Sequence, residues 1–336
     1  MKITTEKFGL GSDLITFENE QGVAISFTNY GARIARWQIP TATGKKNIIW
    51  SFENADEYQA IDSYPGATIG RTAGRITDGQ SKIDHQILLT AQNDGNNTLH
   101  GGFNSFDQKL WNYVITDNGI VFTLVSADGE NGYPGELTLE VNYTYDEENR
   151  WTITYKAVSS KDTLFNPTNH VYFNLTGDVT RPIDEHFLKI NAKGFALLND
   201  QTLPTGEIKS FSESELSLDK GQKMSEVFIS NEPQVKLANG LDHPFFLKNP
   251  SLEEVQAELS YKDLKVSVFT DRPAIVCFSV NFDEAGLEHY QGKLGLHGAI
   301  TFETQVAPGA ERFPEFGNIL LKAGETFRST TVYKLN

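Results

Sequence analysis

The sequence predicts an all-β fold, a large antiparallel β-sandwich with few short helices. Its strongest local signal is an alternation of apolar and polar residues with a period of two, in segments rich in Val, Thr, Tyr, Phe and Ile. This alternation is typical of strands with one buried face. The 28 glycines are spread along the chain, as expected where many strands need many turns. Long helices do not alternate with the strands, which favours sheet packed on sheet over a parallel βαβ fold.

The first half of the chain contains a short helix and three clear strands. Residues 54–60 are the best candidate for a helix, and residues 119–126 alternate as a strand. Residues 136–145 and 151–157 both alternate, and the segment between them is short and polar. These two segments therefore predict a β-hairpin.

The second half begins with a less regular segment. Residues 251–259 have the composition of a helix by intrinsic propensity, but their apolar residues alternate from Val255 onward. We therefore expect a strand here, followed by a turn and a second strand at residues 265–270. A further strand is expected at residues 274–282.

The chain is expected to form a single domain over residues 1–336. Its length would also suit two domains, but we find no repeat of fixed period, no low-complexity tract and no linker with a shift in composition. Hydrophobic residues make up 39% and charged residues 22%, which indicates a globular chain able to bury a sizeable core.

Charge and cysteine content exclude several classes of partner. The net charge is −15, with 44 acidic against 29 basic residues, so we expect no nucleic acid and no anionic membrane as a partner. The N-terminus lacks the apolar core of a signal peptide, and no stretch approaches the roughly 18 apolar residues of a membrane span. Cys277 is the only cysteine, which argues against a disulfide or a cysteine-built zinc site. These features predict a cytoplasmic protein.

The segment FNPTNHVYFNL, residues 165–175, is the least ordinary part of the sequence. It interleaves polar residues with aromatic and aliphatic ones, and each polar group that becomes buried needs a hydrogen-bond partner. In a strand over residues 171–175, Val171, Phe173 and Leu175 would face the core. The opposite face, with His170, Tyr172 and Asn174, would then line a cleft. A satisfied, half-buried histidine is the alternative.

Four further clusters could carry chemistry, although each also has an ordinary structural interpretation. Arg71 and Arg75 lie among small residues, where the simpler interpretation is a glycine turn with solvated arginines. His100 precedes two glycines, which would let the backbone approach a ligand. Asp242 could stabilise a loop through backbone amides. Glu303 lies on an alternating segment, where a carboxylate commonly faces solvent unless that face is the inside of a cleft.

No cluster has the spacing of a zinc site such as HExxH, a GxSxG elbow or a dinucleotide-binding GxGxxG. What remains is histidines, carboxylates, arginine and abundant aromatic residues. This set of side chains suits proton transfer on a neutral polyhydroxylated ligand. We expect no metal and no cofactor.

Taken together and in this order, the clusters resemble the motifs of the aldose 1-epimerase (galactose mutarotase) family. The most specific match is Asn166–Leu175, which resembles the segment around the family's catalytic histidine. The supporting matches are Gly70–Ile76, Leu99–Gly102, Gly132–Gly135, Leu241–Phe245 and Phe302–Gln305. They run from about residue 65 to residue 305, so the resemblance covers nearly the whole chain.

The resemblance implies a galactose mutarotase-like supersandwich that interconverts the α and β anomers of free aldohexoses such as galactose and glucose. It makes His170 the general acid and Glu303 the general base. Arg75, His100 and Asp242 would bind and orient the sugar. The histidine would need a raised pKa to be protonated near neutral pH. The protein would act as a monomer or homodimer.

The sequence departs from the family pattern at positions that bear on the preferred sugar. Gly74 precedes Arg75 where many relatives carry an Asn that touches the sugar. Cys277 and Phe278 stand where many relatives have a Gln and a Tyr.

Three other functions stay open at this point. A hexose-6-phosphate epimerase of the same fold would need several cationic side chains near the cleft, for which only Arg75 and Arg71 are candidates. A non-catalytic carbohydrate-binding sandwich would keep Asp242 but would not need both His170 and Glu303. A glycoside hydrolase would use Asp242 and Glu303 as paired carboxylates, and a histidine acid would then be superfluous.

Overall fold

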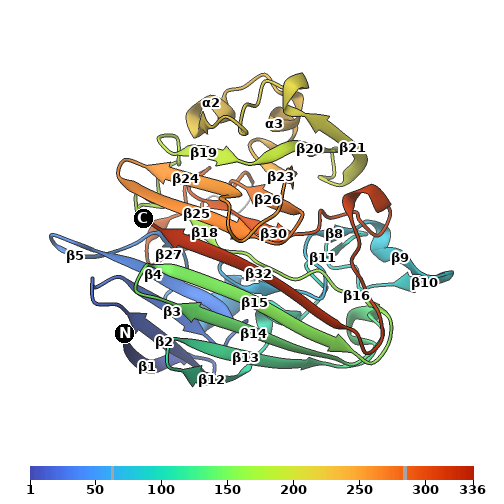
Figure 1. Cartoon of the computed structure of the whole chain (residues 1–336), viewed down its shortest axis with the longest axis horizontal. Coiled ribbons are helices and arrows are strands. Elements are labelled where there is room, and N and C mark those ends of the chain that lie inside the picture. Colours follow the sequence, from blue (N-terminus) through green and yellow to red (C-terminus); the bar gives the residue numbers. More distant parts are fainter. Residues whose placement is uncertain (62–63, 283–285) are drawn as a thin grey trace.

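The computed structural model describes residues 1–61, 64–282 and 286–336. Strands dominate the fold, and three antiparallel sheets hold most of them (Figure 1). Helices are few and short in the described residues, which confirms the predicted all-β class. The helices are α1 (Ala55–Ile61), α2 (Met224–Phe228) and α3 (Pro233–Ala238).

The first sheet is built by the N-terminal strands in chain order, each paired antiparallel with the next. Its strands are β1 (Lys2–Gly9), β2 (Ser12–Glu18), β3 (Ala24–Thr28), β4 (Arg33–Thr41) and β5 (Gly44–Asn47).

The largest sheet has nine strands, and the strand at the C-terminal end of the chain lies in its middle, between β15 and β25. In order across the sheet, its strands are β12 (Asn112–Thr116), β13 (Gly119–Ser126), β14 (Leu137–Tyr145), β15 (Arg150–Ser159), β32 (Thr326–Leu335), β25 (Leu264–Thr270), β24 (Ala257–Tyr261), β19 (Phe187–Ile190) and β22 (Gln222–Lys223).

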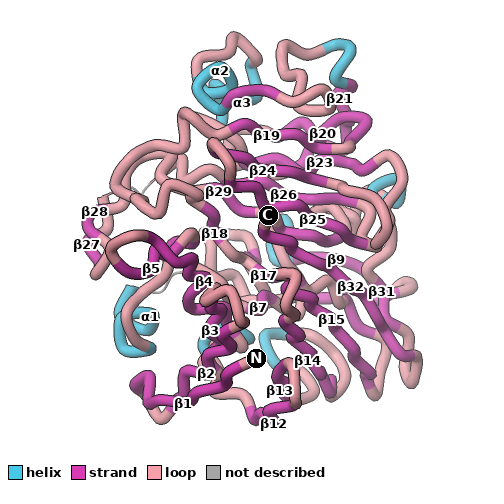
Figure 2. Tube along the Cα trace, turned by 60° about the vertical axis from the view of Figure 1, so that its left-hand side comes forward, coloured by secondary structure: helices cyan, strands magenta, loops and turns pink. Residues whose placement is uncertain are grey.

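A second five-stranded sheet lies toward the end of the molecule where α2 and α3 gather, as Figures 1 and 2 show. In order, its strands are β21 (Pro204–Ser210), β20 (Ala192–Leu198), β23 (Asp242–Leu247), β26 (Ala274–Phe278) and β30 (Glu303–Gln305).

The remaining strands are short and form small sheets of two or three strands. One three-stranded sheet has the order β29 (Ile300–Thr301), β18 (Tyr172–Phe173) and β6 (Ile49–Trp50). The two-stranded pairs are β9 (Gln80–Ile83) with β10 (Gln86–Leu89), β8 (Arg75–Ile76) with β11 (Thr98–Leu99), β16 (Thr163–Leu164) with β31 (Leu320–Leu321), β7 (Thr68–Ile69) with β17 (Thr168–Asn169), and β27 (Glu288–His289) with β28 (Gly292–Lys293).

Aromatic residues pack the first sheet onto the nine-stranded sheet. The ring of Phe27 on β3 lies 5.0 Å from Tyr143 on β14 and 5.8 Å from Trp151 on β15, between centroids. Trp37 on β4 meets Trp151 edge-on at 6.0 Å. On β15 the predicted alternation holds, because Trp151 and the residues at every second position after it are buried. The two sheets therefore form the sandwich that the pattern predicted.

Most of the predicted elements are confirmed. The hairpin, the strand at residues 119–126 and the helix near residues 54–60 appear as β14–β15, β13 and α1. The expected strand, turn and strand around residues 251–270 are present as β24 and β25, but β24 begins only at Ala257. The strand expected at residues 274–282 ends earlier, because β26 stops at Phe278.

The strands that carry the candidate site are much shorter than predicted. Residues 165–175 contain β17 and β18, each of two residues, and His170 lies between them. Residues 300–305 are divided in the same way into β29 and β30. Of these strands, β30 belongs to the second five-stranded sheet, whereas β17, β18 and β29 belong to small sheets of two or three strands. None of the helices among the described residues is both long and apolar enough to cross a membrane.

Candidate active site

One pocket of about 790 Å³ brings together all five side chains that the sequence singled out. They are Arg75, His100, His170, Asp242 and Glu303. Each comes from a different segment of the chain. Asp242 and Glu303 lie on the second five-stranded sheet, whereas the other three lie on or beside short strands.

His170 and Glu303 face each other inside this pocket. The His170 Nε2 atom lies 3.3 Å from Glu303 Oε1, and both side chains are almost fully buried. The backbone fixes the histidine, because its N–H donates to the Ala67 carbonyl and its own carbonyl accepts from the Gly66 N–H. Glu303 begins β30, which pairs with β26. An acid and a base held at this separation can exchange a proton directly.

Burial controls the protonation of this pair. Desolvation lowers the pKa of His170 to about 3, and the positive charge of Arg33 acts in the same direction. Desolvation raises the pKa of Glu303 to about 8, and the charge of Asp242 adds to this rise. Both shifts favour a neutral imidazole and a protonated carboxyl near neutral pH. The expectation of a raised histidine pKa is wrong, because burial disfavours the imidazolium.

His100 lies beside His170, with the two ring centroids 5.2 Å apart, and its backbone adopts a constrained loop conformation. Its φ is +51°, and its Nδ1 accepts a hydrogen bond of 3.2 Å from the Gly74 N–H. A neutral ring with Nδ1 as an acceptor carries its proton on Nε2, which is therefore a donor. Burial lowers the pKa of His100 well below its usual value; a protonated His170 and the charge of Arg75 act in the same direction. The ring of Tyr64 packs against it at 4.6 Å. His100 is thus a neutral hydrogen-bond donor.

Arg75 and Asp242 add two charged groups to the pocket. The Arg75 Nε lies 2.6 Å from Asp94 Oδ2, and both side chains remain partly exposed. Asp242 is the first residue of β23, and its N–H donates to the ring of His243 at 3.1 Å. Both side chains are suited to binding hydroxyl groups, one as a donor and the other as an acceptor.

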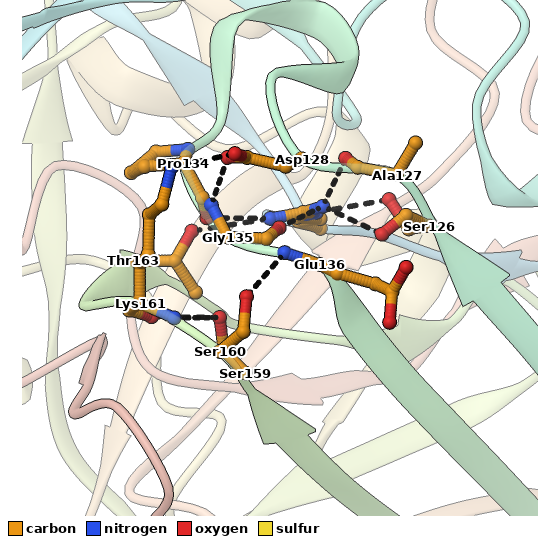
Figure 3. A network of polar contacts seen from close by, with 11 residues as sticks. Ser126, Ala127, Asp128, Pro134, Gly135, Glu136, Ser159, Ser160, Lys161 and Thr163 are labelled. Atoms are coloured by element: carbon orange, nitrogen blue, oxygen red, sulfur yellow. Dashed lines mark hydrogen bonds and ion pairs between the residues drawn. The ribbon is translucent and has the colours of Figure 1, made fainter.

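Arg71 is fully buried, so the interpretation of a solvated arginine at this position is wrong. Its guanidinium donates to the carbonyl oxygens of Ser126, Ala127, Pro134 and Gly135 at 2.8–3.1 Å. It also donates to the hydroxyls of Ser126 and Thr163. Figure 3 shows these loop residues gathered into one polar network. Arg71 ties the loop after β13 to the segment that leads into Arg75, and it does not line the pocket.

The residues that depart from the family pattern have clear structural surroundings. Gly74 has a φ of +75°, and a Cβ placed on it would lie 2.3 Å from Pro308 Cγ. Pro308 therefore covers the place that a side chain at position 74 would need. Phe278 lines the pocket and stacks on Phe282, with centroids 6.4 Å apart. Cys277 is buried in the core and does not line the pocket.

Sequence reasoning missed or misplaced several residues. Tyr64 lines the pocket beside both histidines, and no local pattern indicated it. Gln305 also lines the pocket, and the alternation that places it on the same face as Glu303 could have identified it. Asn174 was expected to face the cleft, but its side chain donates to the carbonyl of Gly298 at 2.7 Å. Asn169 instead binds the Gly66 carbonyl at 2.8 Å and supports the backbone beneath His170.

No group of three or more His, Cys, Asp or Glu side chains that could hold a metal ion occurs among residues 1–61, 64–282 and 286–336. The pocket thus offers polar and aromatic side chains for binding a small neutral ligand and a histidine–glutamate pair for moving protons.

Comparisons with known proteins match the whole chain. A family model described as aldose 1-epimerase matches residues 13–334. The galactose mutarotase of Bos taurus is 33% identical over 340 residues, covering 99% of this chain and 94% of the relative. The aldose 1-epimerase of Escherichia coli K12 is 30% identical and covers 96% and 94%. A crystal structure of galactose 1-epimerase from Lactobacillus acidophilus NCFM superposes with a TM-score of 0.88, at 32% identity over 100% and 99% of the two chains.

Proposed function

Because the chain belongs to the aldose 1-epimerase family, it is an epimerase acting on sugars, and we propose His170 and Glu303 as its acid and base. The reaction is the interconversion of the α and β anomers of free hexoses such as galactose and glucose. The observation that carries the assignment of roles is the buried pair of His170 Nε2 and Glu303 Oε1, 3.3 Å apart in the pocket that Arg75, His100 and Asp242 also line.

Ring opening needs one proton to leave the sugar and one to enter it. The Glu303 carboxylate takes the proton of the C1 hydroxyl while the His170 imidazolium gives a proton to the ring oxygen O5. The C1–O5 bond breaks and leaves an aldehyde, which turns about C1–C2. The ring then recloses on the other face with the two proton transfers reversed. Atoms and charges balance without a cofactor.

The pKa values fit this cycle in a specific way. Ring opening leaves a neutral His170 and a protonated Glu303, which is also the resting state that burial favours. To start with a closed ring, the proton must first pass from Glu303 Oε1 to His170 Nε2, across 3.3 Å. Bound sugar hydroxyls and the positive charge of Arg75, which lowers the Glu303 pKa, would stabilise the resulting ion pair. Arg75 thus supports catalysis by its charge as well as by binding.

Three side chains would hold the sugar. Arg75 and the Nε2–H of His100 would donate to hydroxyl oxygens, and the carboxylate of Asp242 would accept from hydroxyl groups. The rings of Phe278, Tyr64 and Tyr172, which also line the pocket, would pack on the C–H surfaces of the pyranose.

We further propose that residues 1–336 act as one domain in the cytoplasm, as a monomer or homodimer, on a free aldohexose without nucleic-acid or membrane partners. The net charge of −15 and the single cysteine support this proposal. A phosphorylated hexose is disfavoured, because Arg75 is the one Arg or Lys that lines the pocket in the described part of the chain.

The test follows the optical rotation of freshly dissolved α-galactose and α-glucose. The wild type should speed relaxation well beyond buffer, and His170→Asn and Glu303→Gln should each lose roughly 10²–10⁴-fold in rate. His186→Asn is a matched control, because His186 is equally buried but does not line the pocket. Near-wild-type rates in both site variants would refute the proposed roles. Galactose 6-phosphate and a β-galactoside complete the panel, and turnover of either would favour the other functions named above.

A further inference from the structure

The carboxylate of Glu303 is held by a donor at each oxygen. Thr301 Oγ1 donates to Oε1 at 3.1 Å, and Gln305 Nε2 donates to Oε2 at 3.2 Å. Thr301 and Gln305 lie two residues before and after Glu303, so the three side chains project from one face of the segment. Both donor side chains are buried.

An amide side chain stabilises a neighbouring carboxylate only when its NH₂ group points toward that carboxylate. A glutamine presents two donors at Nε2 and an acceptor at Oε1, and rotation of the amide exchanges these ends. With Oε1 turned toward Glu303, Gln305 would repel the carboxylate instead of stabilising it. Something must therefore select the orientation that presents Nε2.

Asn166 makes this selection. Its Nδ2 donates to Gln305 Oε1 at 3.3 Å and to the Val306 carbonyl at 2.9 Å. Its Oδ1 accepts from the Val306 N–H at 3.0 Å and from Arg272 Nη2 at 3.2 Å. A guanidinium only donates, so Arg272 cannot pair with the Nδ2 end of Asn166. The asparagine, which is buried, is therefore fixed as well.

Arg272 is itself held in place, because its side chain is partly buried and its guanidinium lies over the ring of Phe327, 5.3 Å from the centroid. Every hydrogen bond then runs in one direction, from Arg272 through Asn166 and Gln305 to Glu303. Polarised chains of this kind strengthen their terminal hydrogen bond. The result is a donor relay that begins at a positive charge and ends at the carboxylate that has to ionise.

We propose that Gln305 is a positioning residue for Glu303 and that Asn166 fixes the orientation of its amide. This inference rests on the proposed function, in which Glu303 acts as the base. Because the relay stabilises the ionised carboxylate, it favours the ion-pair form of the His170–Glu303 pair, which ring opening requires. It also gives a role to the asparagine near the start of the FNPTNHVYFNL segment.

The test uses Gln305→Met, Asn166→Asp and the double variant. Gln305→Met removes the donor. Asn166→Asp keeps the acceptor for Val306 and Arg272 but cannot donate, so the Gln305 amide turns its Nε2 toward the new aspartate. In each single variant kcat should fall roughly tenfold, with KM changed by less than about threefold. The basic limb of the kcat/KM profile should move about one pH unit higher.

The double variant separates a relay from two independent defects. If Asn166 acts through Gln305, the double variant should be within about twofold of Gln305→Met alone. Multiplied losses, or a basic limb that stays in place in both single variants, would overturn the proposal. Gln256→Met is the matched control, since Gln256 is equally buried but lies next to β24, away from the pocket. Its kinetics should match the wild type.

A second measurement is independent of turnover. In protein labelled with ¹³C at the glutamate carboxyls, the NMR signal of Glu303 is assigned by its loss in Glu303→Gln, and its titration is followed with pH. The apparent pKa should rise by about one pH unit in Gln305→Met and Asn166→Asp and should not change in Gln256→Met. If the wild type failed to accelerate mutarotation, the proposed function would be wrong. The titration would still show whether Gln305 and Asn166 stabilise the ionised Glu303 carboxylate. An unchanged Glu303 titration would overturn the relay alone.

Discussion

Substitution of Arg71 by methionine should reduce the free energy of unfolding by roughly 3–5 kcal/mol. The guanidinium supplies donors to four backbone carbonyls, those of Ser126, Ala127, Pro134 and Gly135. A buried acceptor that loses its donor costs roughly 1–3 kcal/mol. The variant no longer has to bury a charged group, which offsets part of this loss. The net effect is therefore well below the sum of the four separate losses.

Thermal unfolding monitored by circular dichroism measures this effect. The melting temperature of Arg71→Met should fall by about 4–7 °C, because a chain of 336 residues has an unfolding entropy of about 0.7 kcal/mol/K. Arg150→Met is the matched control, because Arg150 is half-exposed and its salt bridge with Asp146 lies on the surface, where such a pair contributes below about 1 kcal/mol. If the two variants melted within about 2 °C of each other, the loop carbonyls would not depend on Arg71, and the reasoning would be refuted.

Three further predictions concern the pocket. First, kcat/KM should fall tenfold per pH unit above about 8, where the His170–Glu303 pair loses its one proton; a profile flat to high pH would contradict this. Second, folding raises the pKa of the Glu303 carboxyl. The stability that this group contributes is therefore present at pH values below its pKa in the unfolded chain, and it is lost as the pH rises toward 8. Glu303→Gln should therefore gain melting temperature relative to wild type between pH 5 and pH 8, and a constant difference would count against the raised pKa. Third, Gly74→Asn should lower the free energy of unfolding, measured in thermal melts, by roughly 1–3 kcal/mol, because the new side chain would collide with Pro308. Gly95→Asn, also at positive φ but with open space around it, should be nearly neutral, and equal costs would contradict the steric argument.

The sequence predicted the regular strands well and the site strands poorly, for one physical reason. Alternation reports a strand whose two faces differ in burial, and this holds along β14 and β15. In β17, β18, β29 and β30 every residue is buried, so the two faces do not differ. Polar side chains in these segments also bind backbone groups of other segments, as Asn169 does, and this shortens the regular pairing.

The sequence clusters contained all five candidate site residues, the family resemblance assigned their roles and selected Arg75 over Arg71, and the structure places all five in one pocket. Residues that act through distant partners could not be found in the same way. The role of Arg71 depends on carbonyls from the loop after β13 and on Thr163, which local spacing does not reveal. The pKa of His170 depends on its burial, which a sequence pattern does not report for a residue between two short strands.

The position of β32 has a consequence for how this protein is made. Its residues, Thr326–Leu335, fill the place between β15 and β25 in the nine-stranded sheet, and Tyr333 also donates to the carbonyl of Phe302, next to Glu303. While the chain is being synthesised, β15 and β25 therefore carry unpaired edges until the last of these residues has emerged from the ribosome. Such edges favour pairing with other nascent chains. The strand that covers these two edges is also the one whose Tyr333 supports the backbone beside the proposed base.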